Sequence, residues 1–264
     1  MFVWHWVQQH RLLTVLILAF VIVSTAGGTA WALVFRTVSS PVGFREALRM
    51  YRKEQTGKML TSLRNKLPAP GVYAYRTSGG EGLNLLGMQR NFPSTTSMIV
   101  AGGQCATVSW VPITQHTETT TVCSGPDGAL NIPKLVTDES IAGSTTTSTT
   151  ECPSTAYLLP PSVKPGQRWS ATCNLTSPAE KVAMTGQAFG SSTVVVGGRP
   201  VAVEHVRFSL TFAGTERGTN PTDFWIVPGN GLIVRERETV DVTQGSVHYN
   251  ESMETTLTGL DPAH

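Results

Sequence analysis

The chain has 264 residues, of which 40% are hydrophobic and 14% charged, whereas an ordinary soluble domain carries about 25% charged residues. Its 35 threonines, 25 glycines and 16 prolines favour β structure and argue against a helical bundle or a coiled coil. A net charge of +2 gives no reason to expect nucleic acid as a partner, because nucleic-acid binding requires a strongly basic face.

The N-terminal region is typical of a membrane anchor. After a short tail, residues 1–11, the segment 12–35 contains no charged residue. As a helix it would be about 36 Å long, which exceeds the roughly 30 Å of a bilayer core. The sequence therefore predicts a transmembrane helix or signal anchor. A cleaved signal peptide is the alternative, because Ala30-Trp31-Ala32 fits an A-x-A cleavage site.

Residues 36–70 form a basic juxtamembrane segment. Ser39-Ser40-Pro41 is a helix-start signal, and Phe44, Leu48 and Tyr51 then recur at helical spacing. Residues 36–66 hold eight Lys/Arg against two Glu, a net charge of +6. The segment predicts a basic amphipathic helix followed by a linker. The helix either contacts anionic lipid headgroups or packs on the following domain.

The four cysteines predict two disulfides. They form no CxxC or Cys/His cluster suited to zinc. Cys105 and Cys123 flank two β-rich runs, and Cys152 and Cys173 flank a turn-rich centre, so folding each segment on itself sets its cysteines opposite each other. We therefore expect the pairs 105–123 and 152–173. Disulfides require an oxidising compartment, so the domain is expected outside the cytoplasm, although the basic residues after the apolar segment favour the opposite orientation.

Residues 71–264 are predicted to form one extracytoplasmic β domain. The segment 137–151, with GSTTTSTTE, is predicted to be a mobile loop. Gly197-Gly198, Gly229-Asn230-Gly231 and Gln244-Gly245 predict tight hairpins, hence an antiparallel meander that closes into a barrel or half-barrel. The expected strands are 72–77, 83–90, 96–101, 105–111, 117–123, 168–175, 181–188, 192–197, 200–213, 222–227, 232–242 and 246–258.

The last hairpin brings carboxylates onto a face that is otherwise apolar. With Gln244-Gly245 as the loop, Glu238 lies opposite Glu251, and Glu236 lies beside them. The preceding strand adds Asp223 and Trp225 to the same face, and a ligand cavity is expected beneath Phe208 and Trp225. The candidate ligand-binding residues are therefore Glu236, Glu238, Glu251, Asp223, Trp225 and Phe208.

Three interpretations of this acidic row are open. The row is exposed to solvent or neutralised by an arginine such as Arg217; or it forms the polar end of a ligand cleft or a site for a hard cation; or it is a paired-carboxylate site of glycosidase type. The sequence contains no GxSxG, HExxH, P-loop or GxGxxG motif, and His116, His205 and His248 each have a structural explanation. We assign no catalytic residue, no metal ligand and no cofactor.

One long amphipathic strand and the hairpin after it carry a resemblance. Val206, Phe208, Leu210 and Phe212 share one face, and WIVPGNGLIVR follows. This pattern resembles the extracytoplasmic half-barrel envelope proteins of the lipoprotein-localisation-factor type and related uncharacterised families. The resemblance implies a concave apolar face that holds an acyl chain or another amphiphile. The chain departs from these proteins in having an apolar span in place of a lipobox, which argues against a soluble lipid shuttle.

Together these features predict a single-pass, membrane-anchored binding or assembly module of the cell envelope. Its expected partners are membrane lipids, through residues 12–70, and an amphiphilic ligand. The alternative is a carboxylate-dependent hydrolase of glycosidase type on the same β scaffold.

Overall fold

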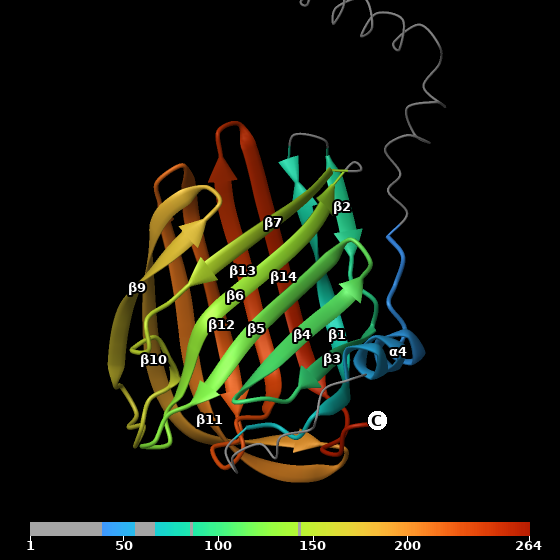
Figure 1. Ribbon diagram of the computed structural model, residues 1–264, viewed down its shortest axis with the longest axis vertical. Helices are drawn as coiled ribbons and strands as arrows, with labels where there is room; N and C mark the ends of the chain where they lie inside the picture. Colours follow the sequence, from blue (N-terminus) through green and yellow to red (C-terminus); the bar gives the residue numbers. More distant parts are fainter. Residues whose placement is uncertain (1–38, 56–66, 85–86, 142–143) are drawn as a thin grey trace, which may run out of the picture. The chain divides into compact units, whose positions relative to one another are not determined.

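The structure is a computed structural model that describes residues 39–55, 67–84, 87–141 and 144–264. In this part of the chain one helix, α4 (Phe44–Gln55), precedes a single sheet of fourteen strands (Figure 1). The strands are β1 (Gly71–Leu83), β2 (Met88–Asn91), β3 (Thr95–Ala101), β4 (Cys105–Ile113), β5 (His116–Ser124), β6 (Leu130–Ile141), β7 (Ser144–Glu151), β8 (Tyr157–Leu159), β9 (Arg168–Thr176), β10 (Ala179–Val196), β11 (Arg199–Ala213), β12 (Glu216–Ile226), β13 (Ile233–Gln244) and β14 (Val247–Leu257).

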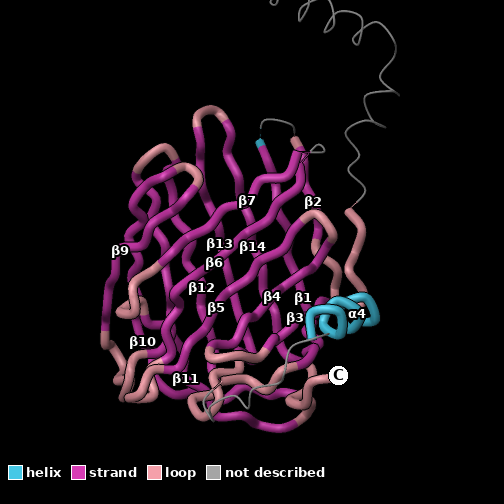
Figure 2. Tube along the Cα trace, in the orientation of Figure 1, coloured by secondary structure: helices cyan, strands magenta, loops and turns pink. Residues whose placement is uncertain are grey.

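Twelve of these strands form a closed antiparallel barrel. Most strands pair with their neighbours along the chain, although β7 pairs with β9 and β3 with β1, and β14 returns to β1 through a ladder that runs from Tyr75↔Leu257 to Leu83↔Tyr249. β2 and β3 follow one another along the other edge of β1, and β8 pairs only with β6. The predicted meander is thus confirmed, and it is a full barrel (Figure 2).

The core lies inside the barrel because hydrophobic side chains alternate along the strands. In β11, buried Val206, Phe208 and Leu210 alternate with less buried residues that face outward. The predicted strands 181–188 and 192–197 are one long strand, β10, which continues through a bulge between Ala188 and Gly190.

The prediction of a mobile loop at 137–151 is wrong. These residues belong mostly to β6 and β7, which are neighbours in the barrel. Threonine is β-branched and therefore suits a half-buried strand. Thr150 is buried, whereas Thr147 donates a hydrogen bond to Asp138 at 2.6 Å among exposed residues. Low sequence complexity concealed this alternation.

The predicted tail 1–11 and membrane span 12–35 lie outside the described residues. None of the helical residues that are described makes a stretch long and apolar enough to cross a membrane. The predicted helix exists, but it begins at Phe44, where the Gly43 carbonyl accepts hydrogen bonds from the first turn, and not at Ser39-Ser40-Pro41. Pro41 instead forms a β-bridge with Ile113.

Helix α4 packs on the outside of the barrel. Its Ala47 and Tyr51 are buried against Val72 of β1 and Ile99 of β3. Arg45, Arg49, Arg52 and Lys53 are exposed on its other sides. Packing on the domain, one of the two predicted alternatives, is therefore what the structure shows for the apolar face of this helix.

Both predicted disulfides are present. Cys105 and Cys123 lie directly opposite each other in the β4–β5 hairpin, with their Cα atoms 4.3 Å apart. Cys152, which follows β7, is bonded to Cys173 of the neighbouring strand β9, again with a Cα–Cα distance of 4.3 Å.

The β13–β14 hairpin has the predicted faces, but its register is shifted by two residues. Gln244 pairs with Val247, so the loop is Gly245-Ser246 and not Gln244-Gly245. Gly245 has a φ of 60°, which suits the first loop position of a type II′ turn, where glycine is preferred.

This shift changes which glutamates meet across the ladder. Every side chain keeps its face, because the shift is even. Glu238 now lies opposite Met253, and Glu251 lies opposite Val240. The prediction that Glu238 lies directly opposite Glu251, on which the glycosidase alternative depended, is therefore wrong.

The length of the loop that the Cys105–Cys123 disulfide closes predicts how much this disulfide contributes to stability. The two cysteines are 18 residues apart, so replacing both by serine should lower the free energy of unfolding by about 3 kcal/mol. Guanidinium denaturation of the full chain measures this change. Thr107 and Thr121 pair in the same hairpin, and their double replacement by serine is the matched control, which should cost less than about 1 kcal/mol. Equal losses in the two double variants would contradict the prediction.

Candidate functional site

Glutamates from six strands face the interior of the barrel. The basic side chains that the structure shows paired with them, within its described residues, are Arg90 of β2 and His116 of β5. Carboxylates are rarely buried unless they are paired or protonated. Each interior glutamate is therefore expected to be either paired with a basic group or protonated. The inward-facing glutamates include Glu81, Glu118, Glu139, Glu216, Glu236, Glu238 and Glu251.

A buried ion cluster lies around His116. The ring is fully buried; its Nδ1 lies 2.8 Å from Glu81 Oε2, and its Nε2 lies 3.2 Å from Glu118 Oε1. Burial alone would lower the pKa of His116, but hydrogen bonds with Glu118, Glu139 and Glu81 outweigh burial and raise the pKa well above its ordinary value. The imidazole is therefore charged at neutral pH.

Glu81 is the ionised carboxylate of this cluster. Its Oε1 lies 2.6 Å from Arg90 Nη2, and both side chains are almost completely buried. Burial raises the pKa of Glu81, but the hydrogen bond and charge of His116 and the charge of Arg90 lower it by more. The pKa therefore lies below its usual value, and Glu81 stays charged.

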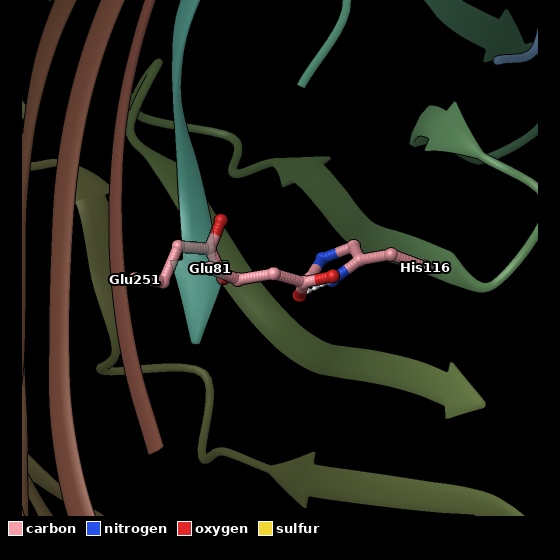
Figure 3. A group of neighbouring side chains, drawn as sticks. All are labelled: Glu81, His116 and Glu251. Carbon is pink, nitrogen blue, oxygen red and sulfur yellow. Dashed lines mark hydrogen bonds and ion pairs between the residues drawn. The ribbon is translucent and has the colours of Figure 1, made fainter. Parts of the chain in front are cut away.

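Glu251 faces Glu81 directly across the β1–β14 ladder (Figure 3). Burial, more than the neighbouring carboxylates, raises the pKa of Glu251 to about 8. The Tyr249 hydroxyl lies 2.9 Å from Glu81 Oε2 and 2.6 Å from Glu251 Oε2. A hydroxyl has one proton to donate, so both contacts are satisfied when Tyr249 donates to Glu81 and protonated Glu251 donates to Tyr249.

Glu236 and Glu238 border a cavity of about 140 Å³ inside the barrel. Burial and then the charge of Glu118 raise the pKa of Glu236 to about 8. Burial and the charges of Glu118, Glu251 and Glu236 raise the pKa of Glu238 well above its ordinary value. The remaining wall is mixed: apolar residues, among them Trp110, Phe208, Leu210 and Phe224, form part of it, and threonines, Asn220, Glu118 and Glu216 are among the rest. The cavity thus combines apolar wall residues with neutral carboxylic acids.

Four of the predicted site residues face the interior. Phe208, Glu236 and Glu238 line the cavity, and Glu251 belongs to the cluster around His116. The predicted neutralisation by Arg217 is not observed, because this arginine is exposed and contacts the Gly214 carbonyl.

Asp223 and Trp225 lie on the outer face, and the prediction that they join the acidic row is wrong. In the β12–β13 ladder Thr222 pairs with Glu238, which places the neighbouring Asp223 outside. Asp223 is bonded there to Arg207 at 2.7 Å, and its pKa is lowered because hydrogen bonds from Arg207 and His205 outweigh the effect of burial. Trp225 stacks on His205 with ring centroids 4.3 Å apart. A bulge after Trp225 explains the misassigned parity.

Arg90 and His116, which neutralise Glu81, are not among the predicted site residues. His116 is the first residue of β5. The alternation His116, Glu118, Thr120, Val122 was available as a signal, since it places the histidine on the same face as core Val122. His248, by contrast, contacts Asp241 at 3.0 Å as a surface pair, which agrees with the structural role expected for it.

Comparisons with known proteins concern the fold alone. No protein-family model and no curated protein matches the chain. Among solved structures, the chain is similar to the hypothetical lipoprotein YmcC from Escherichia coli, with 15% sequence identity and a TM-score of 0.36, over 73% of this chain and 85% of that chain.

The raised pKa of Glu236 predicts how stability depends on pH. A buried acid with a pKa of about 8 stabilises the fold fully below its unfolded value of 4.5, and this contribution is lost as pH rises through about 8. Urea denaturation should therefore show a decrease of a few kcal/mol between about pH 5 and pH 8. The charged group that acts on it is Glu118.

Glu236→Gln should flatten this pH profile, because glutamine cannot ionise. Glu254→Gln is the control: Glu254 lies on the outer face and is paired with Arg235 and Arg237, which lower its pKa and confine its effect to acidic pH. A Glu236→Gln profile as steep as that of the wild type would refute the assignment.

Proposed function

We propose that the barrel is a binding module that holds a small amphiphile, or the end of a larger one, in its interior cavity. The observation that carries this proposal is the pairing of apolar residues in the cavity wall with the neutral acids Glu236 and Glu238. Ligand sites in proteins are typically apolar cavities with a few polar groups that fix orientation.

The size of the cavity limits the apolar part of the ligand. A volume of about 140 Å³ accommodates a group of about the size of benzene or a short alkyl chain. Burying such a group against Phe208, Leu210 and Trp110 supplies the hydrophobic part of the affinity.

The acids favour a cationic polar group. Glu236 and Glu238 are neutral only because burial and the neighbouring Glu118 disfavour their ionised forms. An alkylammonium group beside them reverses that balance, since an opposite charge favours the ionised carboxylate. An anionic group meets Glu118 and is repelled. The proposed ligand class is therefore an amphiphilic amine.

Two disulfides support an extracytoplasmic location for this module, because such bonds persist in oxidising compartments. In this proposal, residues 12–35 anchor the chain in the membrane of the cell envelope by a single span. A β domain held at a membrane surface would be positioned to receive amphiphiles from the bilayer.

Blocking the cavity tests the proposal. Thr222 lines the cavity, whereas Thr211 is exposed on the neighbouring strand. Calorimetric titration of the full chain with hexylamine at pH 7 should show binding to the wild type and to Thr211→Phe. Binding to Thr222→Phe should be at least about tenfold weaker, because the new ring occupies the cavity.

Two further titrations separate charge from shape. Hexanoate, which has the same chain length, should not bind. Glu238→Gln should weaken the binding of hexylamine by about tenfold and leave the binding of 1-hexanol unchanged, because glutamine keeps the volume of the side chain but cannot ionise. Equal binding of the amine and the acid, or equal binding to the two phenylalanine variants, would overturn the proposal.

We also propose that the exposed side of α4 contacts anionic lipid headgroups. Arg45, Arg49 and Lys53 are exposed together with Phe44 and Met50, which are 36% and 38% accessible. A basic helix with apolar residues at its boundary is typical of membrane-surface contact.

A nitroxide label on Met50→Cys measures this contact in the full chain reconstituted into vesicles. The label should be protected from a water-soluble quencher in phosphatidylglycerol vesicles and not in phosphatidylcholine vesicles. Arg45→Glu with Arg49→Glu should abolish the protection. The control pair Arg168→Glu with Arg199→Glu, on exposed positions of β9 and β11, should preserve it. Protection that is the same in both lipids would exclude an electrostatic contact.

A further inference from the structure

Three side chains in the barrel interior present ligand atoms to a common point. One atom each from Glu81, His116 and Glu251 lies within 4.8 Å of the other two, and all three residues are buried. Figure 3 shows Glu81 lying between Glu251 and His116, with the first two on the paired strands β1 and β14 and the third on β5. The barrel walls hold these backbones in place, so the convergence does not depend on a loop.

A second, independent observation points to a ligand at this place. Glu251 Oε1 is buried and has no hydrogen-bond partner. A buried carboxyl oxygen without a partner carries its full desolvation cost. A cation in contact with it removes that cost.

The surrounding residues already hold these groups as ligands are held in metal sites. His116 Nε2 lies 3.2 Å from Glu118 Oε1, which orients the ring and leaves Nδ1 directed at Glu81. Tyr249 bridges Glu81 and Glu251, and Arg90 holds the other oxygen of Glu81. A carboxylate on the distal nitrogen of a histidine is the usual outer partner of a metal ligand.

One pair of ligand atoms already has nearly the separation that a metal site requires, whereas the Glu251 oxygen, within 4.8 Å of the other two ligand atoms, must move toward them. Metal bonds of about 2.1 Å to nitrogen and oxygen place neighbouring ligand atoms about 3.0 to 3.4 Å apart. His116 Nδ1 and Glu81 Oε2 are 2.8 Å apart, so an opening of a few tenths of an ångström admits an ion between them.

We propose that Glu81, His116 and Glu251 bind one divalent transition-metal ion of the zinc type inside the barrel. One imidazole nitrogen with two carboxylates suits Zn²⁺ and its first-row neighbours, whereas Ca²⁺ takes oxygen ligands alone and Cu⁺ prefers sulfur. Binding displaces the proton from His116 Nδ1 and the proton of Glu251 into solvent, and the two carboxylates then balance the charge of the dication. The site is separate from the amphiphile proposal, because none of its three ligands lines the 140 Å³ cavity.

The test is a titration of the full chain, stripped with a chelator, with ZnCl₂ in the absence of any amphiphile. The wild type should bind one Zn²⁺, and CaCl₂ should not compete. Glu251→Gln keeps the size of the side chain and should weaken Zn²⁺ binding by at least about tenfold. Glu254→Gln, on the same strand but on the outer face, should bind as the wild type does.

Two further readouts keep the outcome clear if a variant folds poorly. Co²⁺ should give visible absorption bands in the wild type, and the ¹⁵N signal of the His116 Nδ1 should shift when Zn²⁺ is added to the wild type or to Glu254→Gln, but not when it is added to Glu251→Gln. No binding to the wild type, an unchanged His116 signal, or equal binding to Glu251→Gln and Glu254→Gln would overturn the proposal. Equal binding to the two variants would indicate an adventitious surface ion.

Discussion

The ladder between β1 and β14 is the constraint on which the rest of the structure depends. It joins the last strand to the first over Tyr75 to Leu83, so the sheet closes instead of presenting two open edges. Closure makes one face of every strand an interior with little access to water. The same ladder sets Glu81 directly opposite Glu251, where two ionised carboxylates would repel each other.

The structure resolves this conflict by giving the two carboxyls different protonation states. Arg90 and His116 lie against Glu81 and keep it charged, while Glu251, held by Tyr249, remains neutral because burial raises its pKa to about 8. A buried charge that loses its partner typically costs 3–5 kcal/mol, so the interior depends on these contacts as a set. This arrangement suits a binding or structural centre in which the protonation states of the carboxyl groups depend on the group that is bound there.

The sequence predicted the barrel because local signals sufficed for it. Glycine turns marked the hairpins, alternation marked the strands, and the cysteine spacing marked both disulfides. The register error at Gly245 left Glu236, Glu238 and Glu251 on the correct face, because a shift of two preserves the side-chain alternation. The bulge after Trp225 changes which side chains of β12 and β13 share a face, and no local sequence pattern indicates this bulge. The convergence of Glu81 with His116 depends on barrel closure, which is non-local.

Glu118 links the two interior features that the proposals concern. It is hydrogen-bonded to His116 Nε2 and also lines the cavity beside Glu236 and Glu238. Its charge contributes to the raised pKa of both cavity acids and of Glu251, and its hydrogen bond helps to keep His116 protonated. A cation that enters the cavity would interact with Glu118, which is the same carboxylate that orients the His116 ring. The two interior features therefore share one electrostatic environment, in which a change of charge at one alters the pKa values at the other.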